Sequence, residues 1–228
     1  MTKTFKQFLS EQDDQDLMKF LKENCAQACK DMFEADRYFW RGAEKESDQT
    51  FAVMNRVFPG IIVTPREDRT PRDSIRKIHD AANSWFKRKL GQPIRSNTVF
   101  THPCRATAGR FGPAKAVIPF GKYQVYWSPR VSDFTNYVQP AAPDDGVVGG
   151  NGHKFYNDYS TQQRQDGEIG WIDQEELLEK FLEAADYQEG DVIKALKSKH
   201  EIMVRCSKYL LLDISKANLT KIIMAVNE

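Results

Sequence analysis

An arginine, a threonine and a glutamate are the residues of this chain best placed to do chemistry, because each lies in a short strand-like run. Arg41 and Gly42 end the aromatic run "YFWRG", Thr101 lies in "NTVFTHP", and Glu201 opens "EIMVRC". A planar guanidinium makes paired, charge-assisted hydrogen bonds to phosphate. A carboxylate stabilises positive charge that develops beside it, and a glycine lets a ligand approach the backbone. These segments are therefore the candidates for a functional site.

The cysteines and histidines show no spacing typical of metal ligands. The four cysteines are Cys25, Cys29, Cys104 and Cys206. Cys25 and Cys29 lie four residues apart in a helical pattern, so we expect them to share one face as buried free thiols. His79 lies in a helical segment and His153 in a glycine-rich run, and no set of spaced ligands accompanies either one. We therefore expect no metal and a reducing compartment.

The hydrophobic periodicity and the turn residues predict an α+β fold that can bring these segments together. A short amphipathic stretch is expected over 1–12, longer helices over 14–34, 70–91, 173–187, 190–199 and 215–228, and a helical turn over 105–112. Strands are expected over 37–42, 50–65 and 97–102, with one hairpin over 114–129 and another turning at Ser207 and Lys208. A loop over about 136–170 is long enough to be functional.

Composition adds limits on the class of protein. The chain has 228 residues and a net charge of +1, from 33 basic and 32 acidic residues. This size fits one domain, and this balance gives no overall attraction to nucleic acid or to an anionic membrane, so a nucleic-acid role would need a local patch. No apolar run is long enough to cross a bilayer, and the first residues lack the apolar core of a signal peptide.

Taken together, the three segments resemble the arginine–serine–glutamate branch of the mono-ADP-ribosyltransferases, which use NAD⁺ as substrate. The resemblance implies split antiparallel sheets flanked by helices, and no metal. It implies that Arg41 holds a phosphate or ribose of NAD⁺ and that Gly42 admits the dinucleotide. Thr101 would orient the nicotinamide ribose, with His102 sharing that role. Glu201 would stabilise the oxocarbenium-like state as the nicotinamide–ribose bond breaks.

The chain departs from the family pattern at two positions. Pro103 stands where the family has a second hydroxyl, and Lys199 stands where members that modify arginine carry Glu or Gln. The acceptor of ADP-ribose is then a host protein or a nucleic acid, and arginine is disfavoured. Glu168 in "QDGEIGW" is the alternative catalytic glutamate, but we prefer Glu201 because two strand-like runs follow it. The altered "FTHP" favours a second hypothesis, a catalytically degenerate protein that binds and blocks a host factor.

The first residues carry a second resemblance. "TKTFKQFLSE" is similar to the targeting peptides of internal head proteins of large tailed bacteriophages, which are cut after an apolar-x-Glu site, here Leu9-Ser10-Glu11. The resemblance implies a cleavable leader over 1–11 and an ADP-ribosyltransferase-like domain over 12–228. The protein would be packaged in the phage capsid and would act in the host cytoplasm, without a membrane partner. The alternative is an ordinary amphipathic helix.

Overall fold

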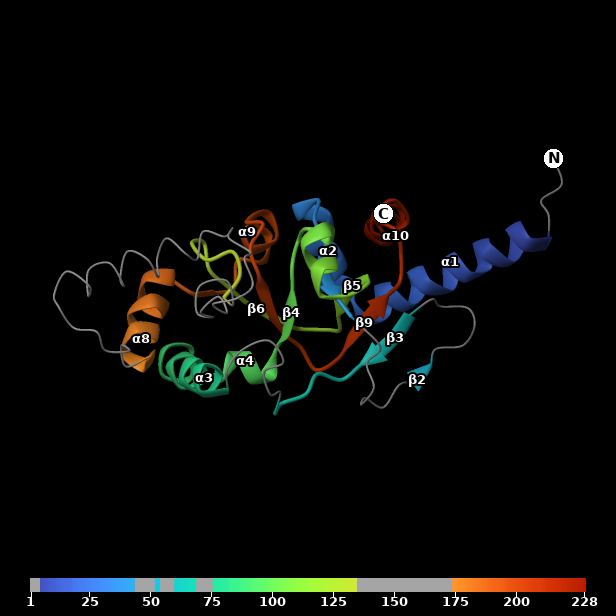
Figure 1. Ribbon diagram of the computed structural model, residues 1–228. Coiled ribbons are helices and arrows are strands. Elements are labelled where there is room, and N and C mark those ends of the chain that lie inside the picture. The colour runs from blue at the N-terminus through green and yellow to red at the C-terminus, as the bar shows by residue number, and fades with distance from the viewer. Residues whose placement is uncertain (1–4, 44–51, 54–59, 69–75, 135–173) are drawn as a thin grey trace.

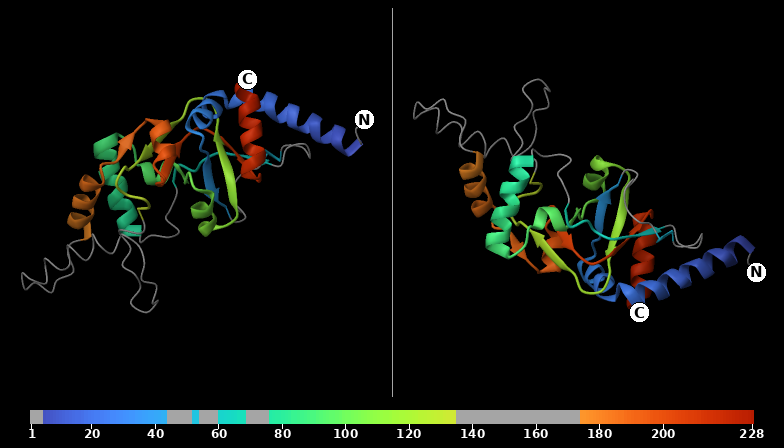
Figure 2. Two further views of the ribbon diagram at one scale, coloured as in Figure 1. Left: turned by 90° about the horizontal axis from the view of Figure 1, so that it is seen from above. Right: turned by 90° about the horizontal axis from the view of Figure 1, so that it is seen from below.

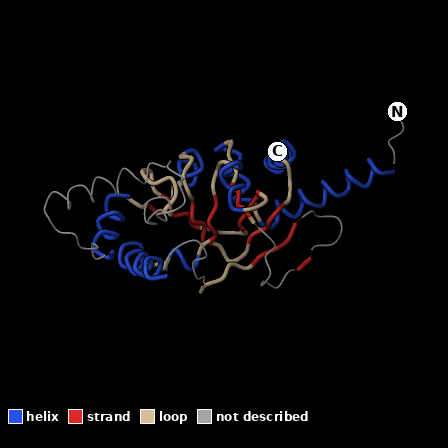
Figure 3. The backbone as a smooth tube through the Cα atoms, viewed as in Figure 1, coloured by secondary structure: helices blue, strands red, loops and turns tan. Residues whose placement is uncertain are grey.

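A computed structural model describes residues 5–43, 52–53, 60–68, 76–134 and 174–228 of the chain. It confirms the α+β class, with two antiparallel sheets and surrounding helices. The strands gather in the centre, and helices lie on the outside (Figures 1 and 3).

The first sheet has the strand order β1-β5-β9-β3-β2, and the second has the order β4-β8-β6-β7. The first consists of β1 (Phe39–Gly42), β2 (Ala52–Val53), β3 (Gly60–Val63), β5 (Ala114–Pro119) and β9 (Tyr209–Leu212). The second consists of β4 (Val99–Thr101), β6 (Gln124–Trp127), β7 (Gln188–Glu189) and β8 (Ile202–Arg205). All neighbouring pairs in both sheets are antiparallel.

Both hairpins expected from the sequence are wrong. β5 pairs with β1 and β9, whereas β6 pairs with β7 and β8, so the chain changes sheets between β5 and β6. It changes sheets again between β8 and β9. The two connections between the sheets are in contact, because the Phe120 N–H donates to the Lys208 carbonyl at 3.0 Å. Both segments have alternating apolar residues and a short turn. This sequence pattern is the same whether the second strand pairs with the first or joins another sheet.

The helices follow the expected periodicity, with two differences. They are α1 (Phe5–Asn24), α2 (Ala26–Ala35), α3 (Arg76–Leu90), α4 (Ile94–Asn97), α5 (Arg105–Ala108) with the 3₁₀ turn η1 (Gly109–Phe111), α8 (Gln174–Ala185), α9 (Val192–Lys197) and α10 (Lys216–Asn227). The expected break near residue 12 is absent and falls at Cys25. α1 therefore continues through the proposed cleavage site and projects away from the sheets (Figure 1). The short α4 is not expected from the sequence.

Two apolar clusters form the core. One packs residues of both sheets against α1, α2, α9 and α10, and the other packs α3 and α8 against further residues of the second sheet. The Cys25 and Cys29 thiols are free and fully buried in the first cluster, as expected. Burial raises the pKa of Cys29 to about 12, so this thiol stays neutral and contributes packing.

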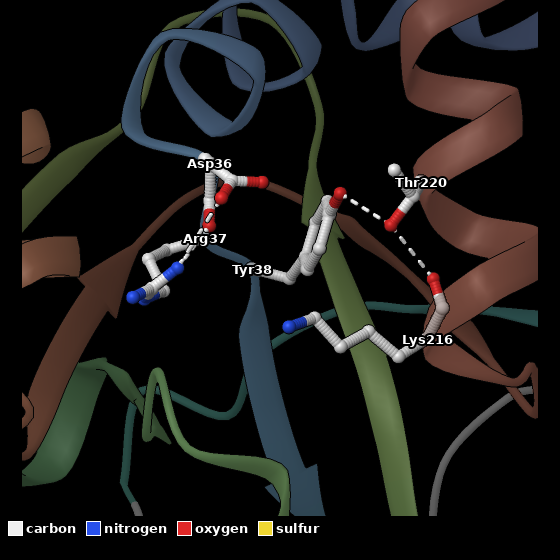
Figure 4. Close-up of polar contacts among 5 residues, drawn as sticks. All are labelled: Asp36, Arg37, Tyr38, Lys216 and Thr220. Atoms are coloured by element: carbon white, nitrogen blue, oxygen red, sulfur yellow. Dashed lines mark hydrogen bonds and ion pairs between the residues drawn. The ribbon is translucent and has the colours of Figure 1, made fainter.

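A hydrogen-bonded clamp joins the start of β1 to α10 (Figure 4). The buried Tyr38 donates its O–H to Thr220 Oγ1 at 2.8 Å, and the Thr220 hydroxyl donates to the Lys216 carbonyl at 2.9 Å. Nearby, Arg37 Nη1 donates to the Asp36 carbonyl at 2.7 Å. The clamp fixes the end of β1 that precedes Arg41.

We expect Tyr38→Phe to lower the free energy of unfolding by about 1 kcal/mol, because it removes one largely buried hydrogen bond and keeps the ring. Urea unfolding measures this. In a Thr220→Val background the same change should cost much less, since the acceptor is already gone. Equal losses in the two backgrounds would contradict the clamp.

Candidate functional site

The two sheets meet where β1 and β4 form one backbone bridge. The Trp40 N–H donates to the His102 carbonyl at 3.0 Å, and the His102 N–H donates to the Trp40 carbonyl at 2.7 Å. Both strands are edges of their own sheets. β8 lies on the other side of β4, so β1, β4 and β8 are neighbours. The structure thereby brings together the three strand segments that carry Arg41, Thr101 and Glu201.

Arg41 and Thr101 share one face of this junction. The bridge sets Trp40 opposite His102, so the next residues along, Arg41 and Thr101, oppose each other and point the same way. Thr101 is buried, and its hydroxyl donates to the Ile202 carbonyl at 2.9 Å. Arg41 is half-buried, and its Nη1 donates to the Tyr209 hydroxyl at 3.3 Å. Thr101 thus holds β4 against β8.

Glu201 faces a buried arginine that the sequence analysis does not single out. Arg95 Nη1 lies 3.9 Å from Glu201 Oε1, and the two side chains are 6% and 16% exposed. The Arg95 guanidinium carbon lies 3.9 Å from the ring centre of Phe134 and 4.9 Å from that of Phe100. The Glu201 N–H donates to the Ser132 carbonyl at 2.8 Å. The carboxylate is therefore largely shielded from solvent with a cation beside it, which strengthens its electrostatic interactions.

Glu201 and Thr101 lie on opposite faces of the strands. Successive strand residues alternate, so Phe100 and His102 point away from the face of Thr101. Glu201 reaches the arginine that stacks on Phe100, which places its carboxylate on the Phe100 side. The junction therefore pairs Arg41 with Thr101 on one face and Glu201 with Arg95 on the other.

A polar network holds Arg95 in place. The Asn83 side-chain oxygen accepts from the Arg95 N–H at 2.9 Å, and the Asn83 amide donates to Ser96 Oγ at 2.7 Å. His79 Nε2 lies 3.0 Å from the same Ser96 oxygen. These contacts anchor the short α4 on α3. An isolated arginine in "PIRSN" has no periodicity or motif, so no sequence signal points to it.

His102 holds the backbone that follows β4 and lies near the turn that precedes Glu201. Its Nδ1 accepts a hydrogen bond from the Cys104 N–H at 2.9 Å, which requires that nitrogen to be unprotonated. The backbone of Lys199 acts to raise the pKa of the His102 ring and so lies near it. Lys199 has a φ of 65°, in the left-handed region, so the chain turns sharply two residues before Glu201. His102 is a positioning residue in this arrangement.

Gly42 has a packing role that the sequence does not reveal. A Cβ added there would lie 2.3 Å from the Ala108 carbonyl oxygen and 2.8 Å from Phe111 Cβ. The segment that comes closest to the Gly42 backbone is therefore the turn formed by α5 and η1, which packs directly on β1.

Glu168, His153 and the loop over 136–170 lie outside the described residues. Within the described part of the chain, no cluster of three or more His, Cys, Asp or Glu side chains could hold a metal ion. No helix there is long and apolar enough to span a bilayer.

Comparison with models of protein families, with curated proteins and with solved structures gives no match to this chain.

We expect Gly42→Ala to destabilise the protein by about 1–3 kcal/mol, because the added methyl overlaps backbone atoms that cannot move aside. Gly109→Ala is the matched control on the same turn, since the nearest atom to its added Cβ lies 4.0 Å away and its φ is −63°. Thermal and urea unfolding compare the two variants. Equal stability would contradict the close approach at Gly42.

Burial lowers the pKa of His102, and the nearby His200 acts in the same direction while Asp133 opposes both. The unfolded chain therefore takes up a proton at higher pH than the folded protein. This contribution to stability is full above the ordinary histidine pKa of about 6.5 and is lost as the pH falls through the lowered value. Urea unfolding between pH 8 and pH 5 should show a smaller acid-side loss in His102→Gln than in wild type. Parallel curves would exclude His102 as the source.

Proposed function

We propose that this protein is an NAD⁺-dependent mono-ADP-ribosyltransferase that modifies a host macromolecule during bacteriophage infection. The observation that carries the proposal is the junction of β1, β4 and β8, where the three segments that resemble the family lie side by side. Two antiparallel sheets meeting at such a junction are compatible with the split sheets that the resemblance implies. Order along the chain and proximity in space thus agree.

Glu201 is the proposed catalytic residue. When the bond from the ribose C1′ to the nicotinamide nitrogen breaks, its electrons leave with nicotinamide and positive charge develops on the ribose. A fixed, largely buried carboxylate stabilises that charge more than water does. In this proposal Arg95 orients the carboxylate, and Ser132 holds its backbone.

The remaining site residues divide between ligand binding and positioning. Arg41 is half-buried at the same junction, and its guanidinium is the group proposed to hold a phosphate or ribose of NAD⁺. The Thr101 hydroxyl is engaged by the Ile202 carbonyl, so we assign it to holding β4 against the strand that begins after Glu201. His102 holds the backbone at Cys104, directly after β4.

A second candidate is a catalytically degenerate relative that binds a host factor or serves as an internal capsid protein. Two contacts favour it. The Thr101 hydroxyl donates to backbone and lies on the other face from Glu201, and the Glu201 carboxylate already has a cationic neighbour in Arg95. The projecting α1 is also compatible with a segment that is removed or bound by other capsid proteins.

Turnover of labelled NAD⁺ tests the proposal, with purified protein in the presence and absence of a bacterial lysate. Glu201→Gln keeps the shape of the side chain and removes its charge. We expect it to lower the rate of nicotinamide release and of label transfer by about 10²- to 10³-fold, the usual cost of losing one preorganised electrostatic group.

Glu168→Gln is the matched control and should retain the activity. If it abolishes turnover while Glu201→Gln does not, the alternative glutamate is the catalytic one. If wild type neither turns over NAD⁺ nor binds it by calorimetry, the enzyme proposal fails and the binding protein is favoured.

A further inference from the structure

The balanced net charge hides a strongly basic segment. Residues 81–132 contain nine basic residues and no acidic one, although an even spread of the 32 acidic residues over 228 positions would place about seven there. This segment therefore has a formal charge of +9, and the rest of the chain, with 24 basic and 32 acidic residues, has −8. A local excess of positive charge is the first requirement for a nucleic-acid role, so we ask where these cations are exposed.

Three of the nine cations are paired with carboxylates. Arg88 binds Glu179, Lys89 binds Glu183, and Arg95 lies against Glu201. The other six make no ion pair with a carboxylate among the residues that the structure describes: Lys87, Arg105, Arg110, Lys115, Lys122 and Arg130. Their charge is available to an anionic partner.

Two of these cations share one short segment with an exposed aromatic ring. This segment is α5 and η1, here called the basic turn (residues 105–111). Arg105 and Arg110 are exposed, and Phe111 beside them is 51% exposed. The backbone and Cβ of Phe111 pack beside Gly42, so the turn is rigidly seated while its ring reaches solvent. In both views of Figure 2 the basic turn, in light green, lies at the opposite end of β1 from α2.

The basic turn borders the candidate site. It begins three residues after His102, and the intervening Cys104 hydrogen-bonds the His102 ring. Hydrogen bonds from Thr107 lower the pKa of the exposed Cys104 thiol, and the positive charge of Arg110 adds to this effect, so Arg110 lies on the Cys104 side. A ligand held here would lie next to the β1–β4 junction.

We propose that the basic turn binds single-stranded nucleic acid, with Arg105 and Arg110 on backbone phosphates and Phe111 stacked on a base. Cations that follow the backbone and an exposed ring that stacks on a base form the usual platform for unpaired strands. A duplex offers phosphates but no free base face, so the ring favours a single strand. This inference goes beyond the proposed function, because the binding requires neither NAD⁺ nor turnover.

Fluorescence anisotropy with short labelled DNA and RNA single strands of mixed sequence tests the ring. Phe111→Ala keeps the Cβ that packs beside Gly42 and removes the exposed ring, so we expect Kd to rise about 5-fold or more. Phe33→Ala on α2 is the matched control, since Phe33 is 49% exposed, and it should leave Kd unchanged. The DNA and RNA arms show which strand is preferred.

Salt dependence tests the cations. Losing two phosphate contacts should make the slope of log K against log salt shallower by about 1.4 in Arg105→Ala/Arg110→Ala. Because Arg105 also lies over Trp40, at 5.3 Å from its ring centre, Arg110→Ala alone is measured as well and should change the slope by about 0.7. Lys87→Ala/Lys122→Ala removes the same charge from the same segment and should leave the slope unchanged.

Four results would overturn the inference: no binding of either single strand at low salt, equal losses in the lysine control, a duplex bound equally well with no effect of Phe111→Ala, or arginine variants that weaken NAD⁺ binding and not oligonucleotide binding. Oligonucleotide binding without NAD⁺ turnover would contradict only the proposed enzyme activity and would support the proposed binding of single strands.

Discussion

The fold depends on one constraint, the pair of backbone hydrogen bonds between Trp40 and His102. β1 and β4 are edge strands, and edge strands expose unpaired N–H and C=O groups. The bridge pairs one N–H and one C=O of each strand and sets the register between the sheets at this point. From that register follow the alignment of Arg41 with Thr101, the seat of the 105–111 turn on Gly42, and the place where Glu201 enters the second sheet.

The Arg95–Glu201 pair has an energetic cost that bears on its role. Moving both charges out of water is expensive, and apolar replacements of buried ion pairs are often neutral or stabilising. Here the arginine is stacked on two aromatic rings, and its helix is tied down by Asn83. The geometry of this pair is therefore maintained by the aromatic rings and by α3 as well as by the attraction between its charges.

The sequence predicts what depends on local pattern and misses what depends on long-range pairing. Periodicity correctly places α3 and α10, and the aromatic run correctly places β1, because burial and backbone geometry act over a few residues. The two hairpins fail because partner choice is decided in the other sheet. Arg95 is missed since its role arises from Phe100, Phe134 and Glu201, which come from three separate elements.

The order of strands also governs how the protein can form during synthesis. β9 is the last of the described strands to leave the ribosome, yet it lies between β5 and β3 at the centre of the first sheet. A nascent chain that stops short of Leu212 leaves two apolar strands with open edges, which favours aggregation. Most pairing in this sheet joins segments far apart in the chain, a topology that folds slowly. The first sheet can therefore close only after β9 has been synthesised, and β5 and β3 keep open edges until then.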